Sequence, residues 1–205
     1  MKIEKILSER GINSLIHFTR AENLPSIMDY GICPRAELYE EEAVFNDEYR
    51  YDDCENAVCT SIEFPNYKMF YRLRMDNPEA DWAVLLISAE AMVDFNCAFC
   101  EMNAGSKPMY SMPLEERMGS SALQNLFKDV SDGRQRTDLG IPDCFPTNPQ
   151  AEVLVFATIP TDYITHVVFV DAYTKKKYEK YVPDDIEAVT EQEYFAPRMD
   201  YKKWQ

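Results

Sequence analysis

The sequence lacks any long apolar run. No stretch of about 18 or more consecutive apolar residues occurs, which excludes a membrane-spanning helix. The N-terminal stretch MKIEKILSERGINSLIHFT carries acidic residues and has no uninterrupted apolar core, so we expect no signal peptide. We therefore expect a cytoplasmic protein that does not engage a membrane.

Histidine is also scarce, with only His17 and His166 in 205 residues. A cysteine hydrolase needs a thiol beside a histidine base. No spacing in the sequence indicates such a pair, and His166 lies in an apolar stretch where a core position is expected. The composition therefore disfavours this enzyme class.

The six cysteines include two closely spaced pairs, Cys54 with Cys59 and Cys97 with Cys100. Together these pairs would supply the four ligands of a zinc site. Neither pair lies in a glycine-rich knuckle, and reduced, partly buried thiols are the usual state in the cytoplasm. We expect no metal.

Basic residues are outnumbered, 21 against 36 acidic ones, which gives a net charge of -15. This balance argues against nonspecific binding of nucleic acid, because such binding depends on neutralising phosphates. The acidic residues gather in 37–55 and in a second run near the C-terminus, whereas 67–75 and 127–139 are locally basic. Charge alone therefore leaves the class of partner open.

The length fits one domain, 1–205, and the 46% hydrophobic content is sufficient for a core. Apolar alternation and apolar runs predict strands over 14–19, 56–62, 81–88, 151–159 and 164–171. Helical spacing predicts helices over 3–9, 23–31 (with Asn23 as N-cap), 65–75 and 121–130, while 91–100 is ambiguous. Strands and helices do not alternate regularly, which favours the α+β class.

Two polar pairs interrupt this apolar pattern. Side chains two apart on a strand share a face, so His17 pairs with Thr19, and Gln150 pairs with Glu152. A buried carboxylate is costly unless it is paired, so Glu152 belongs in a cleft or a polar network. The alternatives are a surface strand end for Glu152 and a satisfied core histidine for His17.

The stretches HFT (17–19), NLPSI (23–27) with Gly31, and QAEVLV (150–155) stand in an order that resembles the DarT family. Members of that family are bacterial toxins that transfer ADP-ribose from NAD to bases in single-stranded DNA. The resemblance runs from about residue 15 to 170. It implies an ADP-ribosyltransferase-like fold, in which twisted antiparallel or mixed sheets form a central NAD cleft with flanking helices. It also implies an ADP-ribosyl-hydrolase antitoxin as partner.

The resemblance assigns roles residue by residue. Glu152 matches the catalytic glutamate and Gln150 would position the acceptor, while 101–149 corresponds to the substrate-recognition loop. Arg35 would meet the pyrophosphate of NAD, since its guanidinium fork suits phosphate oxygens. The full set of NAD contacts implied is His17, Phe18, Thr19, Asn23, Leu24, Arg35, Tyr67 and Met69.

Two positions depart from the family. Asn66 stands where a catalytic arginine is expected, so we predict that Lys68 supplies the cation, with Arg72 and Arg74 as alternatives. Pro149 stands where a basic residue commonly precedes Gln150. Both departures suit a branch that modifies guanine rather than thymine.

The segment 101–149 also holds the candidate DNA contacts. It contains four of the six glycines, and an excursion of this length is typically functional. The predicted phosphate contacts are Lys128, Arg134 and Arg136, with Lys107 and Arg117 as further bases and with Tyr110 and Phe127 as stacking faces. The alternative for these basic residues is an ordinary solvated surface. The alternatives for the protein's function are an RNA or protein acceptor and an inactive NAD- or nucleic-acid-binding module.

Overall fold

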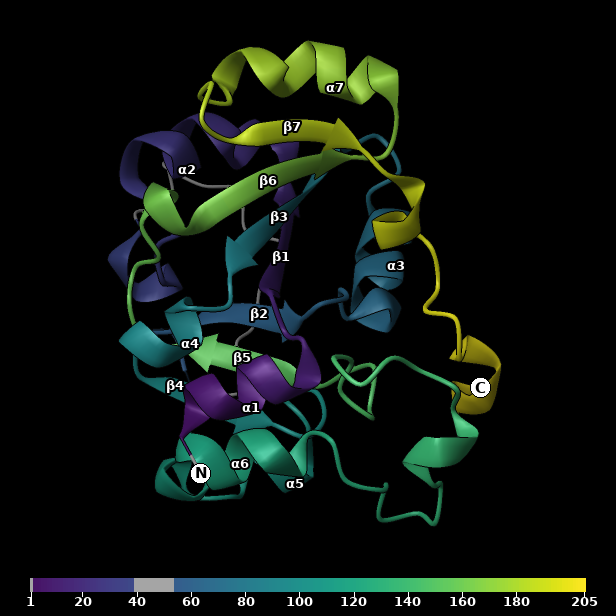
Figure 1. The fold of residues 1–205 in the computed structure, drawn as a ribbon. Coiled ribbons are helices and arrows are strands. Elements are labelled where there is room, and N and C mark those ends of the chain that lie inside the picture. Colours follow the sequence, from purple (N-terminus) through teal and green to yellow (C-terminus); the bar gives the residue numbers. More distant parts are fainter. Residues whose placement is uncertain (1, 39–53) are drawn as a thin grey trace.

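The computed structural model describes residues 2–38 and 54–205. Most of the acidic run 37–55 lies outside these residues. The described chain builds a seven-stranded sheet in the order β4-β5-β2-β1-β3-β6-β7 (Figure 1). The strands are β1 Ser14–Arg20, β2 Val58–Ile62, β3 Trp82–Ser88, β4 Cys97–Cys100, β5 Glu152–Val155, β6 Ile164–Phe169 and β7 Glu187–Thr190.

Short helices surround the sheet. The α-helices are α1 Ile3–Arg10, α2 Leu24–Tyr30, α3 Tyr67–Asp76, α4 Ala91–Asp94, α5 Lys107–Tyr110, α6 Gly119–Asn125 and α7 Ala172–Tyr178. The 3-10 helices are η1 Ala21–Asn23, η2 Arg35–Glu37, η3 Leu114–Arg117, η4 Arg136–Asp138, η5 Thr161–Tyr163, η6 Glu179–Tyr181, η7 Gln192–Phe195 and η8 Tyr201–Trp204. This mixture, with antiparallel pairing everywhere except between β6 and β7, confirms the α+β class.

At the centre of the sheet, β1 and β2 share the fewest paired residues of any two neighbouring strands. β1 pairs with β3 along all seven of its residues, but it pairs with β2 only at Leu15–Ile62 and Ile16–Ser61. Beyond these positions β1 and β2 diverge. The sheet therefore consists of two halves, β1-β3-β6-β7 and β2-β5-β4, that join at one end and part at the other.

Alternation along β1 directs side chains to two different cores. Leu15 is fully buried in the main core, which α1, α2 and α6 cover, because residues of these helices pack into it. Ile16 faces the opposite side and packs with Phe70 and Leu73 of α3. α3 therefore covers one face of the sheet, beside the place where β1 and β2 part.

Several predicted elements are confirmed with small shifts at their ends, and the exceptions have local causes. Helix 121–130 was predicted too long: α6 ends at Asn125, and the carbonyl of Leu126 instead accepts the amide of Thr147. Strand 151–159 was also too long, because after Val155 the chain leaves β2 and Ile159 forms an isolated bridge with Ile32.

The ambiguous stretch 91–100 resolves into α4 followed by β4. Asn23 occupies the N-cap position of α2 as predicted, but its side chain makes no capping bond. Its amide Nδ2 instead donates to the hydroxyl of Thr19, at 3.0 Å. No helix within the described residues is long and apolar enough to cross a membrane.

Candidate functional site

Glu152 is the first residue of β5, and only 6% of it is exposed. Its Oε1 accepts hydrogen bonds from the side-chain amides of Asn66, at 3.0 Å, and Asn103, at 3.1 Å. Its Oε2 accepts the backbone N–H of Ala104, at 2.8 Å. The surface alternative is therefore wrong, because this carboxylate is buried and held in place by three neutral donors.

Asn66 connects this carboxylate to helix α3. It occupies the N-cap, where its side-chain Oδ1 accepts the backbone N–H of Met69 at 3.3 Å. The backbone N–H of Asn66 donates to the Ser61 hydroxyl. Asparagine is among the preferred N-cap residues because its side-chain oxygen satisfies an unpaired helical N–H. Its remaining Nδ2 group points at Glu152. The residue that departs from the family pattern thus lies in the centre of the site.

The segment 103–104 closes the network from the other side. The Asn103 amide reaches both the Glu152 carboxylate and, at 4.0 Å, the Met69 sulfur. These residues open the stretch 101–149 that we predicted as the substrate-recognition loop. A movement of that loop would therefore change the donors around Glu152.

His17 lies where β1 and β2 diverge. Its Nδ1 is 2.9 Å from the carbonyl of Cys59 on β2, so Nδ1 carries the proton because a carbonyl oxygen can only accept. This bond crosses the parting between the two halves of the sheet. Most of the other predicted NAD residues fall into two groups.

One group follows His17 along the main-core face: Thr19 is buried and bonded to Asn23, and Leu24 is fully buried. The other group lies on the α3 face, where the ring of Phe18 stacks on Phe70 with centroids 4.5 Å apart. Tyr67 and Met69 lie in the first turn of α3, and Arg35 opens η2. Apart from Arg35, the predicted NAD contacts thus divide between the two faces of β1.

Gln150 does not share a strand face with Glu152, contrary to our prediction. It lies in a turn before β5, where its backbone N–H donates to Asn148 Oδ1 at 2.9 Å. The backbone N–H of Ala151 donates to the Asn148 carbonyl. The strand argument fails because the ladder begins only at Glu152. A role for Gln150 in positioning the acceptor stays a prediction.

The predicted replacement cations on α3 contact the C-terminal segment. Lys68 Nζ donates to the carbonyl of Trp204, and Arg74 donates to the carbonyl of Phe195. Arg72 is exposed. None of the three has a contact with Glu152 among the described residues.

A different cation lies beside β5. Arg117 is 5% exposed, and its Nη1 is 3.8 Å from the sulfur of Cys100, which pairs with Glu152 across β4 and β5. Opposed residues of an antiparallel pair point to the same face. Within the described residues, no carboxylate forms an ion pair with Arg117 and its Nε has no hydrogen-bond partner. A buried guanidinium without an ion pair in this part of the chain is a candidate for function, because burial of a charge is costly.

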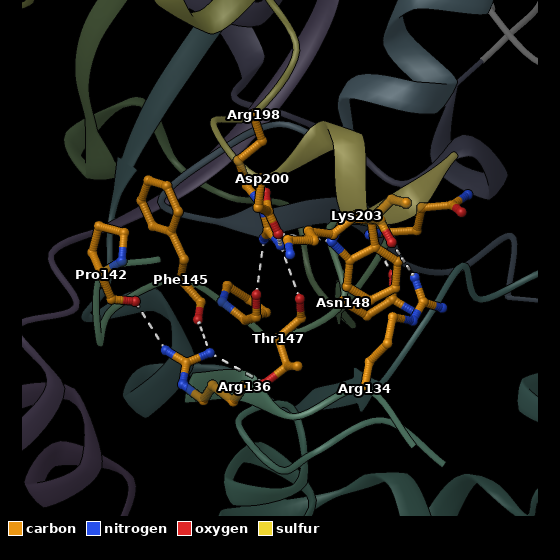
Figure 2. Close-up of polar contacts among 12 residues, drawn as sticks. Arg134, Arg136, Pro142, Phe145, Thr147, Asn148, Arg198, Asp200 and Lys203 are labelled. Atoms are coloured by element: carbon orange, nitrogen blue, oxygen red, sulfur yellow. Dashed lines mark hydrogen bonds and ion pairs between the residues drawn. The ribbon is translucent and has the colours of Figure 1, made fainter. Parts of the chain in front are cut away.

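Arg136 and Arg198 hold the loop that leads into β5 (Figure 2). The Nη atoms of Arg136 donate to the carbonyls of Pro142, Asp143 and Phe145 and to the hydroxyl of Thr147. Arg198, only 2% exposed, donates to the carbonyls of Pro146 and Thr147, at 2.8 Å each. These two guanidinium groups approach the 145–147 backbone from opposite sides in Figure 2.

The C-terminal segment completes this arrangement. Asp200 accepts two bonds of 2.7 Å from Arg198 and a third from the Trp204 indole. Burial alone would raise the pKa of Asp200, but the bonds from Arg198 outweigh it and lower the pKa. Arg134 lies 3.8 Å above the ring of Trp204 and pairs with Asp132.

The predicted DNA contacts therefore have partners of different kinds. Arg134 and Arg136 are engaged within the chain, whereas Lys128 is exposed and lines, with Arg136, an open hollow of about 650 Å³. Asp129 and Asp143 line the same hollow, so it is not distinctly basic. Contact of these bases with DNA stays a prediction.

Cys97 and Cys100 do not point toward one common metal site. Cys97 and Cys100 lie three apart on β4, so Cys97 faces the main core and Cys100 the opposite side. Burial raises the pKa of Cys97 to about 12 and that of Cys100 to about 11, which keeps both thiols protonated. Among the described residues, no group of three or more potential ligands is placed to hold a metal ion.

Two of these residues were not assigned from the sequence. The signal for Asn66 was present, since asparagine is a typical N-cap residue and Asn66 stands near the start of the predicted helix 65–75. Arg198 gave no signal, because its partners in 146–147 lie far away along the chain.

Comparison with known proteins gives one family. Residues 16–201 match the family model described as DarT, ssDNA thymidine ADP-ribosyltransferase. No curated protein matches the chain.

Solved structures of similar fold include three from this family. Thermosipho africanus DarTG in complex with ADP-ribose is 18% identical, with a TM-score of 0.58 over 89% of this chain, which spans 50% of that one. Thermus sp. 2.9 DarT in complex with NAD+ is 12% identical, with a TM-score of 0.56 over 89% of this chain and 97% of that one. Thermus sp. 2.9 DarT in complex with ADP-ribosylated ssDNA is 10% identical, with a TM-score of 0.63 over 91% of this chain and 97% of that one. The fold is thus the predicted ADP-ribosyltransferase-like one, and because the family match covers most of its length, the chain belongs to the DarT family of ssDNA ADP-ribosyltransferases.

Proposed function

We propose that this protein cleaves the nicotinamide–ribose bond of NAD and transfers the ADP-ribose to a base in single-stranded DNA. The observation that carries the proposal is the buried carboxylate of Glu152, held by three neutral donors in a chain of this family. These three donors are neutral, and the carboxylate itself carries the negative charge on which the reaction depends.

The chemistry follows from that charge. As the bond from ribose C1′ to nicotinamide breaks, positive charge builds on the ribose, as it does in glycoside cleavage. Glu152 stabilises that charge and then accepts the proton that the attacking base nitrogen releases. A new bond from C1′ to the base replaces the broken one, and nicotinamide leaves with the bonding electron pair.

The NAD cleft is proposed at the divergence of β1 and β2. His17, Thr19 and Asn23 supply polar groups on one side, and Tyr67 supplies a ring on the other, where it would stack on nicotinamide. Arg35 remains the proposed pyrophosphate contact. No metal takes part in this scheme.

The catalytic cation has two candidates. Lys68 is the one that the sequence suggests, and it remains a proposal. Arg117 is the second, favoured by its burial and by its contact with Cys100 opposite Glu152. Gln150 is proposed to orient the acceptor base.

Thymidine is the acceptor to test first, because the family description names it. The guanine preference that we expected from Asn66 and Pro149 has no support from the comparisons. An RNA or protein acceptor, and an inactive binding module, are the remaining alternatives. An ADP-ribosyl-hydrolase antitoxin is proposed as partner from the family resemblance, which would make this protein the toxin of a pair acting in the cytoplasm.

The test uses labelled NAD with separate pools of single-stranded DNA, RNA and protein. We expect label in DNA with the wild type and none with Glu152→Gln, which keeps the side-chain size but removes the charge. Oligonucleotides that contain thymine or guanine as the single variable base identify the acceptor. Label in RNA or protein alone would overturn the DNA assignment, and no transfer to any pool would favour the inactive module.

A further inference from the structure

A second cavity lies between α3 and the C-terminal segment, which run along the same side of the molecule (Figure 1). It has a volume of about 360 Å³, within the range of small-molecule sites. We call it the aromatic groove. Its lining residues are Tyr67, Lys68, Phe70, Tyr71, Arg74, Tyr194, Phe195, Ala196, Pro197, Tyr201, Trp204 and Gln205.

The groove presents aromatic faces together with positive charge. Seven of its twelve lining residues are aromatic, two are basic, and none is acidic. In a chain where acidic residues outnumber basic ones 36 to 21, this selection is opposite to the overall balance. Rings flanked by cations suit a flat, anionic ligand, because bases stack on aromatic faces and phosphates pair with Lys and Arg.

Two buried donors on the walls lack acceptors. The hydroxyl of Tyr67 and the Nε of Arg74 have no hydrogen-bond partner within the described chain. The Lys68 ammonium group donates one hydrogen bond to the Trp204 carbonyl. An ammonium group has three N–H donors in all, so one such bond uses only one of them. Buried polar groups are nearly always satisfied, so unpaired donors around a groove indicate a ligand that brings acceptors.

The groove also adjoins the catalytic network. Tyr67, on its wall, directly follows Asn66, whose amide bonds Glu152. Arg198, next to the groove residue Pro197 in the chain, donates to the 146–147 carbonyls that lead to Glu152, and Asp200 accepts from Arg198. A ligand in the groove would therefore lie next to the site of transfer.

We propose that the aromatic groove binds a nucleotide of the single-stranded DNA that flanks the target base. Its rings stack on that nucleotide's base, and Lys68 and Arg74 face the phosphate. This inference rests on the proposed function, because it adds a second contact for the same substrate. It differs from the predicted contacts Lys128 and Arg136, which line the acid-containing hollow.

The test uses Tyr71, a groove residue that is 55% exposed, so that its replacement does not open the core. Tyr71→Ala removes the stacking face and Tyr71→Phe retains it. Tyr173→Ala is the matched control, because Tyr173 is 77% exposed on α7, outside the groove. Binding of a fluorescein-labelled thymine-containing oligonucleotide is measured by anisotropy without NAD, and NAD binding is measured separately by calorimetry.

We expect Tyr71→Ala to weaken oligonucleotide binding about tenfold, because the variant removes one aromatic face on which a base stacks. Tyr71→Phe and Tyr173→Ala should match the wild type, and NAD binding should be the same in all four proteins. Unchanged oligonucleotide binding in Tyr71→Ala, with the wild type still modifying DNA, overturns the groove proposal and leaves the proposed function intact. Weaker NAD binding with unchanged oligonucleotide binding assigns the groove to the dinucleotide and also overturns it. If the wild type neither binds nor modifies DNA, the proposed function itself fails.

Discussion

The amide of Asn66 lies 3.0 Å from the carboxylate of Glu152 while its oxygen caps helix α3. One side chain thus fixes both the start of the helix and the orientation of the proposed catalytic group. The two tasks use different atoms, Oδ1 for the cap and Nδ2 for the carboxylate. They can therefore be separated by substitution.

Asn66→Ser and Asn66→Ala make this separation. Serine caps helices well but is too short to reach Glu152, whereas alanine loses both contacts. We expect both variants to lose transfer activity about tenfold, and Asn66→Ala to be less stable than Asn66→Ser by about 1 kcal/mol. Steady-state kinetics and urea unfolding measure the two effects. Wild-type turnover in Asn66→Ser would show that the amide does not orient the carboxylate.

Arg117 and Lys68 give opposite expectations for the catalytic cation. We expect Arg117→Gln to lower kcat about 100-fold, the usual loss when one electrostatic contact to a transition state is removed. Lys68→Ala should raise KM for the oligonucleotide more than it lowers kcat, because Lys68 faces the aromatic groove. Circular dichroism checks that both variants fold. A large fall in kcat for Lys68→Ala, with normal kcat in Arg117→Gln, would return the role to Lys68.

The buried pair of Arg198 and Asp200 makes stability depend on pH. Because its folded pKa is lowered, Asp200 stabilises the fold above its unfolded pKa of about 3.9, and this contribution is lost as pH falls through the folded pKa. Asp200→Asn leaves Arg198 buried without its partner, which we expect to cost about 3–5 kcal/mol near pH 7. The difference from wild type should shrink near pH 3, as measured by urea unfolding at both values. An equal difference at both pH values would contradict this account.

Both the backbone conformation of Gly31 and the atoms around it disfavour any residue with a Cβ atom. Its φ is +85°, and a Cβ atom would lie 2.5 Å from the carbonyl oxygen of Ile159. Gly133 has a similar φ of +94° but no atom within 4 Å, so Gly133→Ala carries the backbone cost alone. We expect Gly31→Ala to lower Tm by several degrees more than Gly133→Ala, at about 2–4 °C per kcal/mol for a chain of this size. Equal Tm values in calorimetry would show that the backbone at Ile159 moves away from the new Cβ atom without a loss of stability.

The sequence predicted the central strands well because their residues are apolar on both faces. β3 is the example, with Ala83, Val84, Leu85 and Ile87 all fully buried. β7 was missed because it is an edge strand whose ends, Glu187 and Thr190, are exposed, so its pattern resembles a loop. Local patterns predict what a segment buries, and an edge strand buries little.

The site shows the same limit. Glu152 was assigned because a carboxylate in an apolar strand stands out and because it lies in a recognisable stretch. Arg117 and Arg198 were not assigned to the site, since an arginine looks the same in sequence whether it is solvated or buried. Their partners, Cys100 and the 146–147 carbonyls, are defined only by tertiary packing.

The hydrogen bonds from Arg198 to the 146–147 carbonyls also have a consequence for the order in which the site forms during synthesis. The ribosome releases the chain from its N-terminus, so Glu152 and its loop emerge well before the arginine that holds them. An unfinished chain possesses every proposed NAD contact but lacks the residue that fastens the loop leading into β5. For a protein whose proposed activity would damage its own cell's DNA, this order keeps the nascent chain from fastening that loop until Arg198 has emerged.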